Sequence, residues 1–331
     1  MPLYSFTPRK NNAAIWVPIV IALAIFPLVV TNEYLLSIAV MAGIYVILTL
    51  GLNVTNGWTG LMSFGYAAFY GIGAYTAAIL ATRYSAPAWV TFPAAGAMAA
   101  LFGVAIALPT LRLKGIFLAL ITIGFQEIVF LVTLNWISLT RGPMGIPGIP
   151  PPTIFGYTFS SNRDYFYLIL VLNILVIFFI DRIIDSRVGR AFIAIREDDV
   201  AAQSVGIPVF RMRVLSFVIS TTMAGIAGAF FAHHAAFVSA ESFRLDETFV
   251  ILTMLIVGGM GTLVGPIIGA VFLVIFPEVA RFLSQYREIV YGAILILVIL
   301  FRPEGIAGVP GIIHAPPRKI EPPTPAREEG R

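Results

Sequence analysis

The chain has 331 residues, of which 59% are apolar and only 11% are charged, and it contains no cysteine. Because soluble domains carry about 25% charged residues, a water-soluble globule of this composition would lack the charges to cover its surface. The net charge of +4 and the lack of a basic stripe with interleaved aromatic residues argue against nucleic-acid binding. Three histidines without cysteine do not provide an ordinary metal centre. The composition is that of an integral membrane protein.

Apolar stretches long enough to cross a bilayer recur along the chain. A helix that crosses about 30 Å of hydrocarbon needs roughly 20 mostly apolar residues. The expected spans, in chain order, are 13–30, two spans within 34–82 that divide near 53–60, 84–111, 115–140, 165–180, 214–232, 248–277 and 289–301. The first stretch is long and ends without a small-residue cleavage site, which favours a retained span over a signal peptide. The sequence therefore predicts an all-α polytopic membrane protein.

The distribution of basic residues predicts the orientation. Of the 21 lysines and arginines, six (at 83, 141, 163, 244, 281 and 287) fall on one predicted side and the other 15 on the opposite side. The side with more basic residues is expected to be cytoplasmic, which puts both termini inside and requires an even number of crossings. We therefore expect the run 248–277 to break at Gly258-Gly259-Met260-Gly261. This gives about ten transmembrane helical elements, and 248–277 either crosses twice or re-enters.

Three regions follow from these patterns. Residues 1–12 form a short cytoplasmic lead, 13–301 the transmembrane domain, and 302–331 a proline-rich cytoplasmic tail that we expect to be disordered. The external stretch 141–164 is expected to form a structured cap. Gly261, Gly265 and Gly269 recur every four residues, which predicts one helix face that packs closely in the bundle or at a subunit interface; we adopt the bundle interpretation.

One cytoplasmic loop, 181–213, is strongly charged, with six basic and five acidic residues. Within it, residues 189–205 are expected to form one short helix that stops at Gly206 and Pro208. Two interpretations of this helix are open. It is either a docking element for a cytoplasmic partner or a solvated interfacial helix.

The sequence of this loop resembles a known element. GRAFIAIREDDVAAQSVGI (189–207) is similar to the coupling-helix segment of the permease subunits of branched-chain amino-acid ABC importers, and closest to the M-type. Five further segments are also similar to the family and occur in the family's order along the chain, at 51–80, 134–152, 214–232, 257–270 and 300–307. At Ala240 the family usually has proline. Importers of urea and short amides share these motifs and remain an alternative.

The resemblance implies a permease subunit that imports branched-chain or related hydrophobic amino acids across the bacterial inner membrane. Its implied partners are a second permease, two ATP-binding subunits and a periplasmic substrate-binding protein. Contacts with the ATP-binding subunits would fall on Gly189, Arg190, Arg196, Glu197, Asp198 and Asp199. No cofactor is expected on this chain, and it is not expected to be an enzyme.

The positions of the lysines also indicate that ATP binds to another subunit. A Walker A loop needs G-x-x-x-x-G-K-[S/T], and none of the three lysines, Lys10, Lys114 and Lys319, follows a glycine. ATP hydrolysis would then belong to a separate chain. The alternative from another class is a self-sufficient secondary transporter. Such a protein is expected to have intramembrane charge pairs or inverted repeats.

Polar residues at membrane depth are the candidates for a substrate path. Gln126 and Glu127 fall near the middle of 115–140, where an ionisable side chain is costly. Glu127 either lines the path and meets a substrate amino group, or is neutral and fixes helix packing. Asn53 and Asn56 flank the expected break near 53–60, and either contact the substrate or satisfy local backbone groups.

Overall fold

A computed structural model describes residues 13–30, 32–111, 115–154, 156–279, 287–302 and 305–307. Every structural statement below concerns these residues. The expected cytoplasmic lead (1–12) and almost all of the expected proline-rich tail lie outside them.

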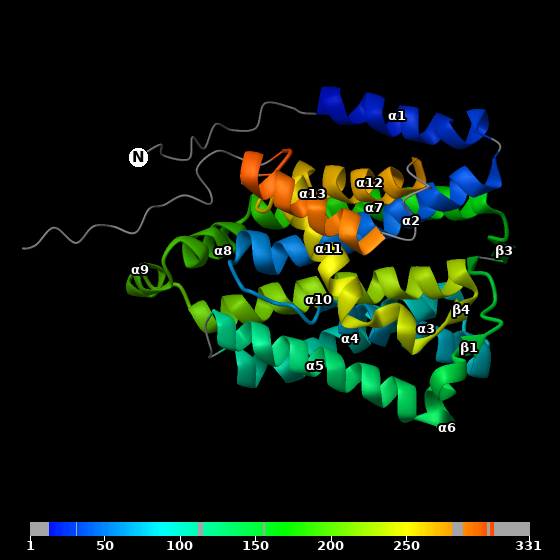
Figure 1. Cartoon of the computed structure of the whole chain (residues 1–331), viewed down its shortest axis with the longest axis horizontal. Coiled ribbons are helices and arrows are strands. Elements are labelled where there is room, and N and C mark those ends of the chain that lie inside the picture. Colours follow the sequence, from blue (N-terminus) through cyan, green and yellow to red (C-terminus); the bar gives the residue numbers. More distant parts are fainter. Residues whose placement is uncertain are drawn as a thin grey trace, which may run out of the picture.

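Within this part of the chain, ten helices have at least 14 residues, and most of them run lengthwise along the molecule, whereas α11 is steeply inclined (Figure 1). They are α1 (Ala13–Val29), α2 (Glu33–Leu52), α3 (Tyr66–Tyr84), α4 (Ala88–Thr110), α5 (Ile116–Asn135), α7 (Asn162–Ile184), α10 (Val209–Ala235), α11 (Leu245–Gly258), α12 (Val264–Val279) and α13 (Arg287–Phe301). Five helical spans, namely 33–58, α4, α5, α7 and α10, are long and apolar enough to cross a membrane by length and composition. The predicted all-α polytopic fold with about ten helical elements is confirmed.

Short elements mark the two ends. One end carries α8 (Arg187–Glu197) and α9 (Asp199–Ser204), and we call it the α8 end. The opposite end, the sheet end, carries α6 (Ile137–Thr140), the turn η2 (Gly142–Met144) and two small antiparallel sheets. β1 (Ile146–Pro147) pairs with β4 (Phe237–Val238), and β2 (Thr153–Ile154) pairs with β3 (Tyr157–Thr158). The stretch 141–164, expected as a structured cap, supplies β1, β2 and β3.

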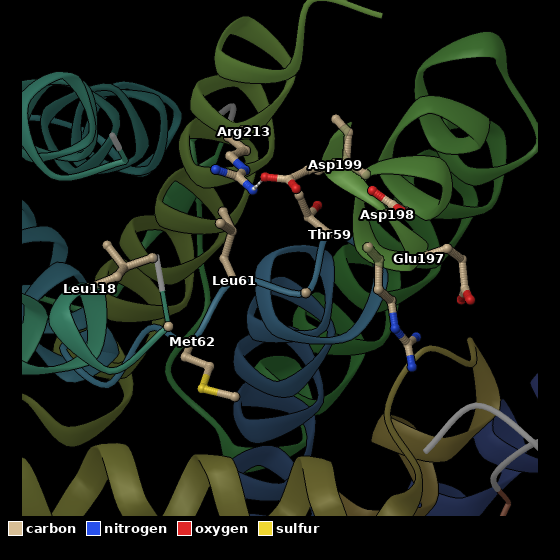
Figure 2. Close-up of a pocket in the computed structure, with 12 residues that line it drawn as sticks. Thr59, Leu61, Met62, Leu118, Glu197, Asp198, Asp199 and Arg213 are labelled. Atoms are coloured by element: carbon tan, nitrogen blue, oxygen red, sulfur yellow. Dashed lines mark hydrogen bonds and ion pairs between the residues drawn. The ribbon is translucent and has the colours of Figure 1, made fainter. Parts of the chain in front are cut away.

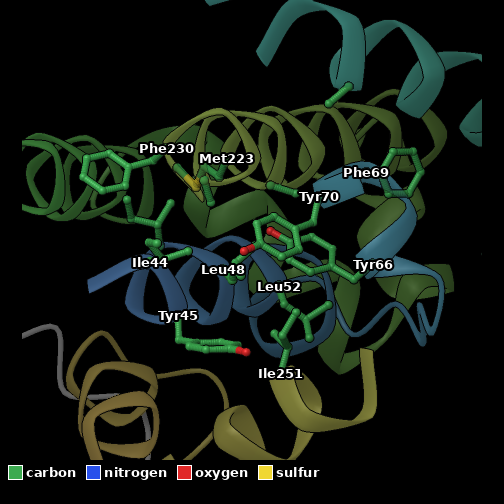
Figure 3. Packing of buried hydrophobic residues seen from close by; sticks show 14 of the residues in the cluster. Ile44, Tyr45, Leu48, Leu52, Tyr66, Phe69, Tyr70, Met223, Phe230 and Ile251 are labelled. Atoms are coloured by element: carbon green, nitrogen blue, oxygen red, sulfur yellow. The ribbon is translucent and has the colours of Figure 1, made fainter. Parts of the chain in front are cut away.

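The core forms where α2, α3 and α10 meet (Figure 3). Tyr66 and Phe69 of α3 lie with Leu52 of α2 and Met223 and Phe230 of α10 in one buried cluster. Since lipid provides no hydrophobic drive for helices to associate, close backbone approach has to supply the packing energy. The glycines of α3 and α10 permit it. A Cβ atom on Gly73 would overlap the carbonyl oxygen of Gly225, and one on Gly228 would overlap that of Tyr70.

The glycine-rich break in 248–277 is confirmed, but the expected helix face through Gly261, Gly265 and Gly269 is wrong for Gly261. Helix α11 ends at Gly258 and α12 begins at Val264. Gly261 lies in the turn between them with φ +77°, a left-handed conformation that glycine adopts without steric cost. Gly265 and Gly269 do lie in α12 against α11, where a Cβ would overlap carbonyl oxygens of Gly259 and Met254 respectively.

The charged loop is shorter than the expected 181–213, because α7 continues to Ile184 and α10 already begins at Val209. Its expected single helix, 189–205, is two helices that Asp198 separates. Asp198 has an extended backbone (φ −159°), and its carboxylate accepts hydrogen bonds from the backbone N–H groups of Val200 (2.9 Å) and Ala201 (3.0 Å). An aspartate that can cap a helix in this way favours starting a new helix over continuing the old one.

The close approach of α3 and α10 can be tested with Gly228→Leu. The added side chain has to displace backbone of α3, and overpacking of this kind costs about 1–3 kcal/mol. The midpoint of thermal unfolding in detergent, followed by tryptophan fluorescence, should fall by several degrees. Gly124→Leu in α5 is the matched control, because no atom lies within 4 Å of a Cβ built there. Equal midpoints for the two variants would contradict the packing account.

Candidate functional site

Of the six residues in and between α8 and α9 that are expected to contact ATP-binding subunits, five have different roles near the surface. Gly189 is buried, and a Cβ there would overlap the carbonyl oxygen of Ile184, so it permits the tight turn from α7 into α8. Asp199 forms an ion pair of 2.9 Å with Arg213 of α10, and Asp198 caps α9. Arg190 and Glu197 are exposed at the surface of α8. Of these five, Arg190, Glu197 and Asp198 therefore present exposed charged side chains to a partner.

Arg196, the sixth residue, points inward instead. Its Nη1 donates a hydrogen bond of 2.6 Å to the carbonyl oxygen of Gly57. Gly57 belongs to the π-helical turn η1 (Asn53–Trp58), which continues α2. The arginine thus connects the surface helix α8 to the interior of the bundle rather than to solvent alone.

Asn53 and Asn56, candidates for the substrate path, are bonded to backbone groups of the broken segments. Asn53 is fully buried; its Nδ2 donates to the carbonyl of Thr262 (2.7 Å) and its Oδ1 accepts from the N–H of Gly261 (2.8 Å). Asn56 forms a similar pair with the carbonyl (3.2 Å) and N–H (3.3 Å) of Ser63. Both amides therefore satisfy backbone groups, as the second interpretation of these residues expects.

Gln126 and Glu127 lie in the middle of α5 and have different surroundings. Gln126 is fully buried, donates to the carbonyl of Phe243 and accepts from the N–H of Ala68. Glu127 is exposed on the outer side of α5, which does not fit the alternative that it fixes helix packing within this chain. Successive residues of a helix lie about 100° apart, and α5 turns only one of the two side chains inward.

The contact of Gln126 with Phe243 also relocates a charged segment. Phe243 ends the short helix η3 (Ala240–Phe243), and its bond to Gln126 places it level with the middle of α5. The charged residues 241–247 therefore begin inside the span of the bundle, whereas the distribution of basic residues placed Arg244 on the side opposite the cytoplasm. A signal was present in the sequence: several charges directly precede the short apolar helix α11.

Three of the charges at this depth form an exposed polar strip. Arg244 forms an ion pair of 3.3 Å with Glu241. Its guanidinium carbon lies 5.6 Å from the ring centre of Phe130. Phe130 follows Glu127 by about one turn of α5. Arg244, Glu241 and Glu127 are all exposed; we call these three residues the polar strip. Sequence reasoning found Glu127 but missed its two companions.

A cavity of about 360 Å³ separates α8 from the start of α5 (Figure 2). Asp199 and Arg213 lie on its one side, Leu61 and Met62 of the segment before α3 on another, and Leu118 of α5 on the third. Charged side chains gather on its α8 side, and apolar side chains line its α5 side. We call this cavity the α8–α5 slot.

The described residues form a polytopic helical bundle with broken helices, a polar strip on an outer face at mid-depth and short charged helices at one end, an arrangement that fits a membrane transport subunit. The profile of the family described as "Branched-chain amino acid transport system / permease component" matches residues 34–299. The chain belongs to this family.

Individual relatives agree with the family. The high-affinity branched-chain amino acid transport system permease protein LivM of Salmonella typhimurium is 38% identical, covering 92% of this chain and 77% of the relative. LivM of Escherichia coli K12 is 40% identical over 82% of this chain and 69% of its own length. The permease LivH of E. coli K12 is 26% identical over 81% of this chain and 92% of its own length. No solved structure matches the chain.

Proposed function

We propose that this chain is one permease subunit of an ATP-driven importer of branched-chain or related hydrophobic amino acids. The observation that carries the proposal is α8, a short helix between two membrane helices that presents Arg190 and Glu197 outward and is bonded to the bundle through Arg196. The names of the relatives support branched-chain amino acids over urea or short amides as the cargo.

The α8 end is assigned to the cytoplasm of a bacterial inner membrane. Arg182, Arg187, Arg190, Arg211 and Arg213 gather there, as the distribution of basic residues in membrane proteins favours for the inner side. Helix α1 begins and α13 ends toward this end (Figure 1), which supports two cytoplasmic termini. Two ATP-binding subunits would dock on α8, and a periplasmic binding protein would deliver substrate at the sheet end.

The polar strip supports a second permease as partner. Charged side chains at mid-depth are costly against lipid and in membrane proteins turn toward protein or a water-filled path. In the proposed complex a second permease covers this face, and Glu127 lines the path between the two subunits. Its carboxylate can accept a hydrogen bond from the ammonium group of a passing amino acid. This chain binds no cofactor in the proposal; ATP acts on the partner subunits.

The proposal predicts ATP-dependent uptake by a complex reconstituted in vesicles with the second permease, the ATP-binding subunits and the binding protein. Leucine, isoleucine or valine should be taken up and urea should not. Arg190→Ala with Glu197→Ala should reduce uptake and the ATPase activity stimulated by substrate, because both charges face the proposed docking surface. Uptake without ATP-binding subunits, or of urea alone, would contradict the proposal.

The role of Glu127 is tested by Glu127→Gln in the same assay. Loss of one charge-assisted hydrogen bond, about 1.5–3 kcal/mol, should lower the maximal uptake rate roughly tenfold or more while the complex still assembles. Glu33→Gln, which removes an exposed glutamate at the start of α2, is the matched control and should transport normally. Wild-type rates for Glu127→Gln would remove this residue from the path.

A further inference from the structure

The side chain of Arg196 occupies a space that two glycines, Gly60 and Gly261, leave open. A Cβ on Gly60 would lie 3.1 Å from Cγ of Arg196, and one on Gly261 would lie 2.6 Å from its Nη1. Gly57 supplies the carbonyl oxygen that Nη1 bonds. These glycines come from two segments about 200 residues apart, 57–60 and 259–263, so one arginine of α8 bonds one break in the helical bundle and lies against the other.

The two breaks are also bonded to each other. The amide of Asn53 holds the N–H of Gly261 and the carbonyl of Thr262, and Nε1 of Trp58 donates to the carbonyl of Gly261 at 3.0 Å. A Cβ on Gly57 would lie 2.8 Å from the backbone nitrogen of Gly261. This close backbone contact lies beside the side chain of Arg196. A displacement of Arg196 should therefore move both segments together.

A third segment, residues 305–307 after α13, bonds the end of α11. The N–H groups of Ile306 and Ala307 donate to the carbonyls of Val257 (2.8 Å) and Gly258 (2.9 Å). These are carbonyls at the end of α11, which the helix itself leaves without partners. A Cβ on Gly305 would lie 2.5 Å from Cα of Gly259. The segment after α13 thereby holds the same turn that Arg196 approaches from the other side.

Among the described residues, an open space separates α8 from the start of α5. The α8–α5 slot lies between Gly115 and Leu118 on one side and residues 195–199 on the other. The described structure thus bonds α8 to η1 and places Arg196 beside the α11–α12 turn, and it leaves room between α8 and α5, the helix that carries Glu127 of the polar strip.

We infer that Arg196 is a positioning residue that makes α8, η1 and the α11–α12 turn one rigid unit, which ATP-driven movement of α8 shifts against α5. This inference rests on the proposed function. The movement of α8 changes the width of the slot and displaces the broken segments relative to the polar strip. An arginine suits this role, because its planar guanidinium keeps its charge and donates several hydrogen bonds in a fixed geometry, which lysine does not.

The test uses spin labels in the assembled complex, since this chain has no cysteine of its own. Labels replace Val200 in α9 together with either Ile306 or Ile116, all of which are exposed. Pulsed electron resonance is recorded without nucleotide and with trapped ATP. The 200–306 distance should stay constant, whereas the 200–116 distance should change. Equal changes in both distances of the wild type would overturn the inference without any substitution of Arg196.

Variants of Arg196 test the residue itself. Arg196→Ala and Arg196→Lys should lower leucine taken up per ATP hydrolysed by about tenfold, within the range of typical coupling effects, and should broaden the 200–306 distance distribution. Arg211→Ala, which removes an exposed arginine at the start of α10 and outside α8, is the control and should couple normally. Normal coupling in both Arg196 variants would overturn this inference but leave the proposed function intact. A wild-type complex that takes up no leucine with ATP would instead refute the proposed function and the inference with it.

Discussion

A backbone that leaves the helical conformation inside a membrane has to find hydrogen-bond partners within the protein, because lipid offers none. This chain leaves it at η1 and the segment that follows, at η3 and at the α11–α12 turn. Asn53, Asn56, Thr122 and Gln126 each bond backbone groups of one of these segments. The architecture therefore depends on a few buried amides and hydroxyls, and the apolar helices pack around them.

Two consequences for function follow from where these partners lie. Gln126 draws Phe243 into the bundle and leaves Glu127, Glu241 and Arg244 on an open face at mid-depth. At the α8 end, Asn53 brings both helix breaks to one place, where Arg196 meets them. Broken helices thus serve the proposed importer twice: they carry polar groups to the path, and they give the surface helix a firm connection to the interior.

Much of the fold could be predicted from the sequence, because apolar runs and glycine clusters report directly on helices and breaks. The break at Gly258–Gly261 and the turn at Gly206 are examples. Side-chain direction could not be predicted. Neither the inward turn of Arg196 nor the outward turn of Glu127 follows from spacing, since both depend on which neighbour occupies the other side of the helix. The depth of Arg244 and Glu241 could not be predicted either, because the contact that fixes it, between Gln126 and Phe243, joins residues 117 positions apart.

Hydrogen–deuterium exchange of the assembled complex tests most directly whether the two breaks act together. Backbone amides of residues 57–63 and 257–263 should change their protection in parallel when ATP is trapped, because Trp58 bonds Gly261 and Arg196 bonds Gly57 while lying against Gly261. Amides in the middle of α4, which packs against α3 and α10 away from α8, should keep theirs. A change confined to one of the two segments, or none in either, would contradict the account.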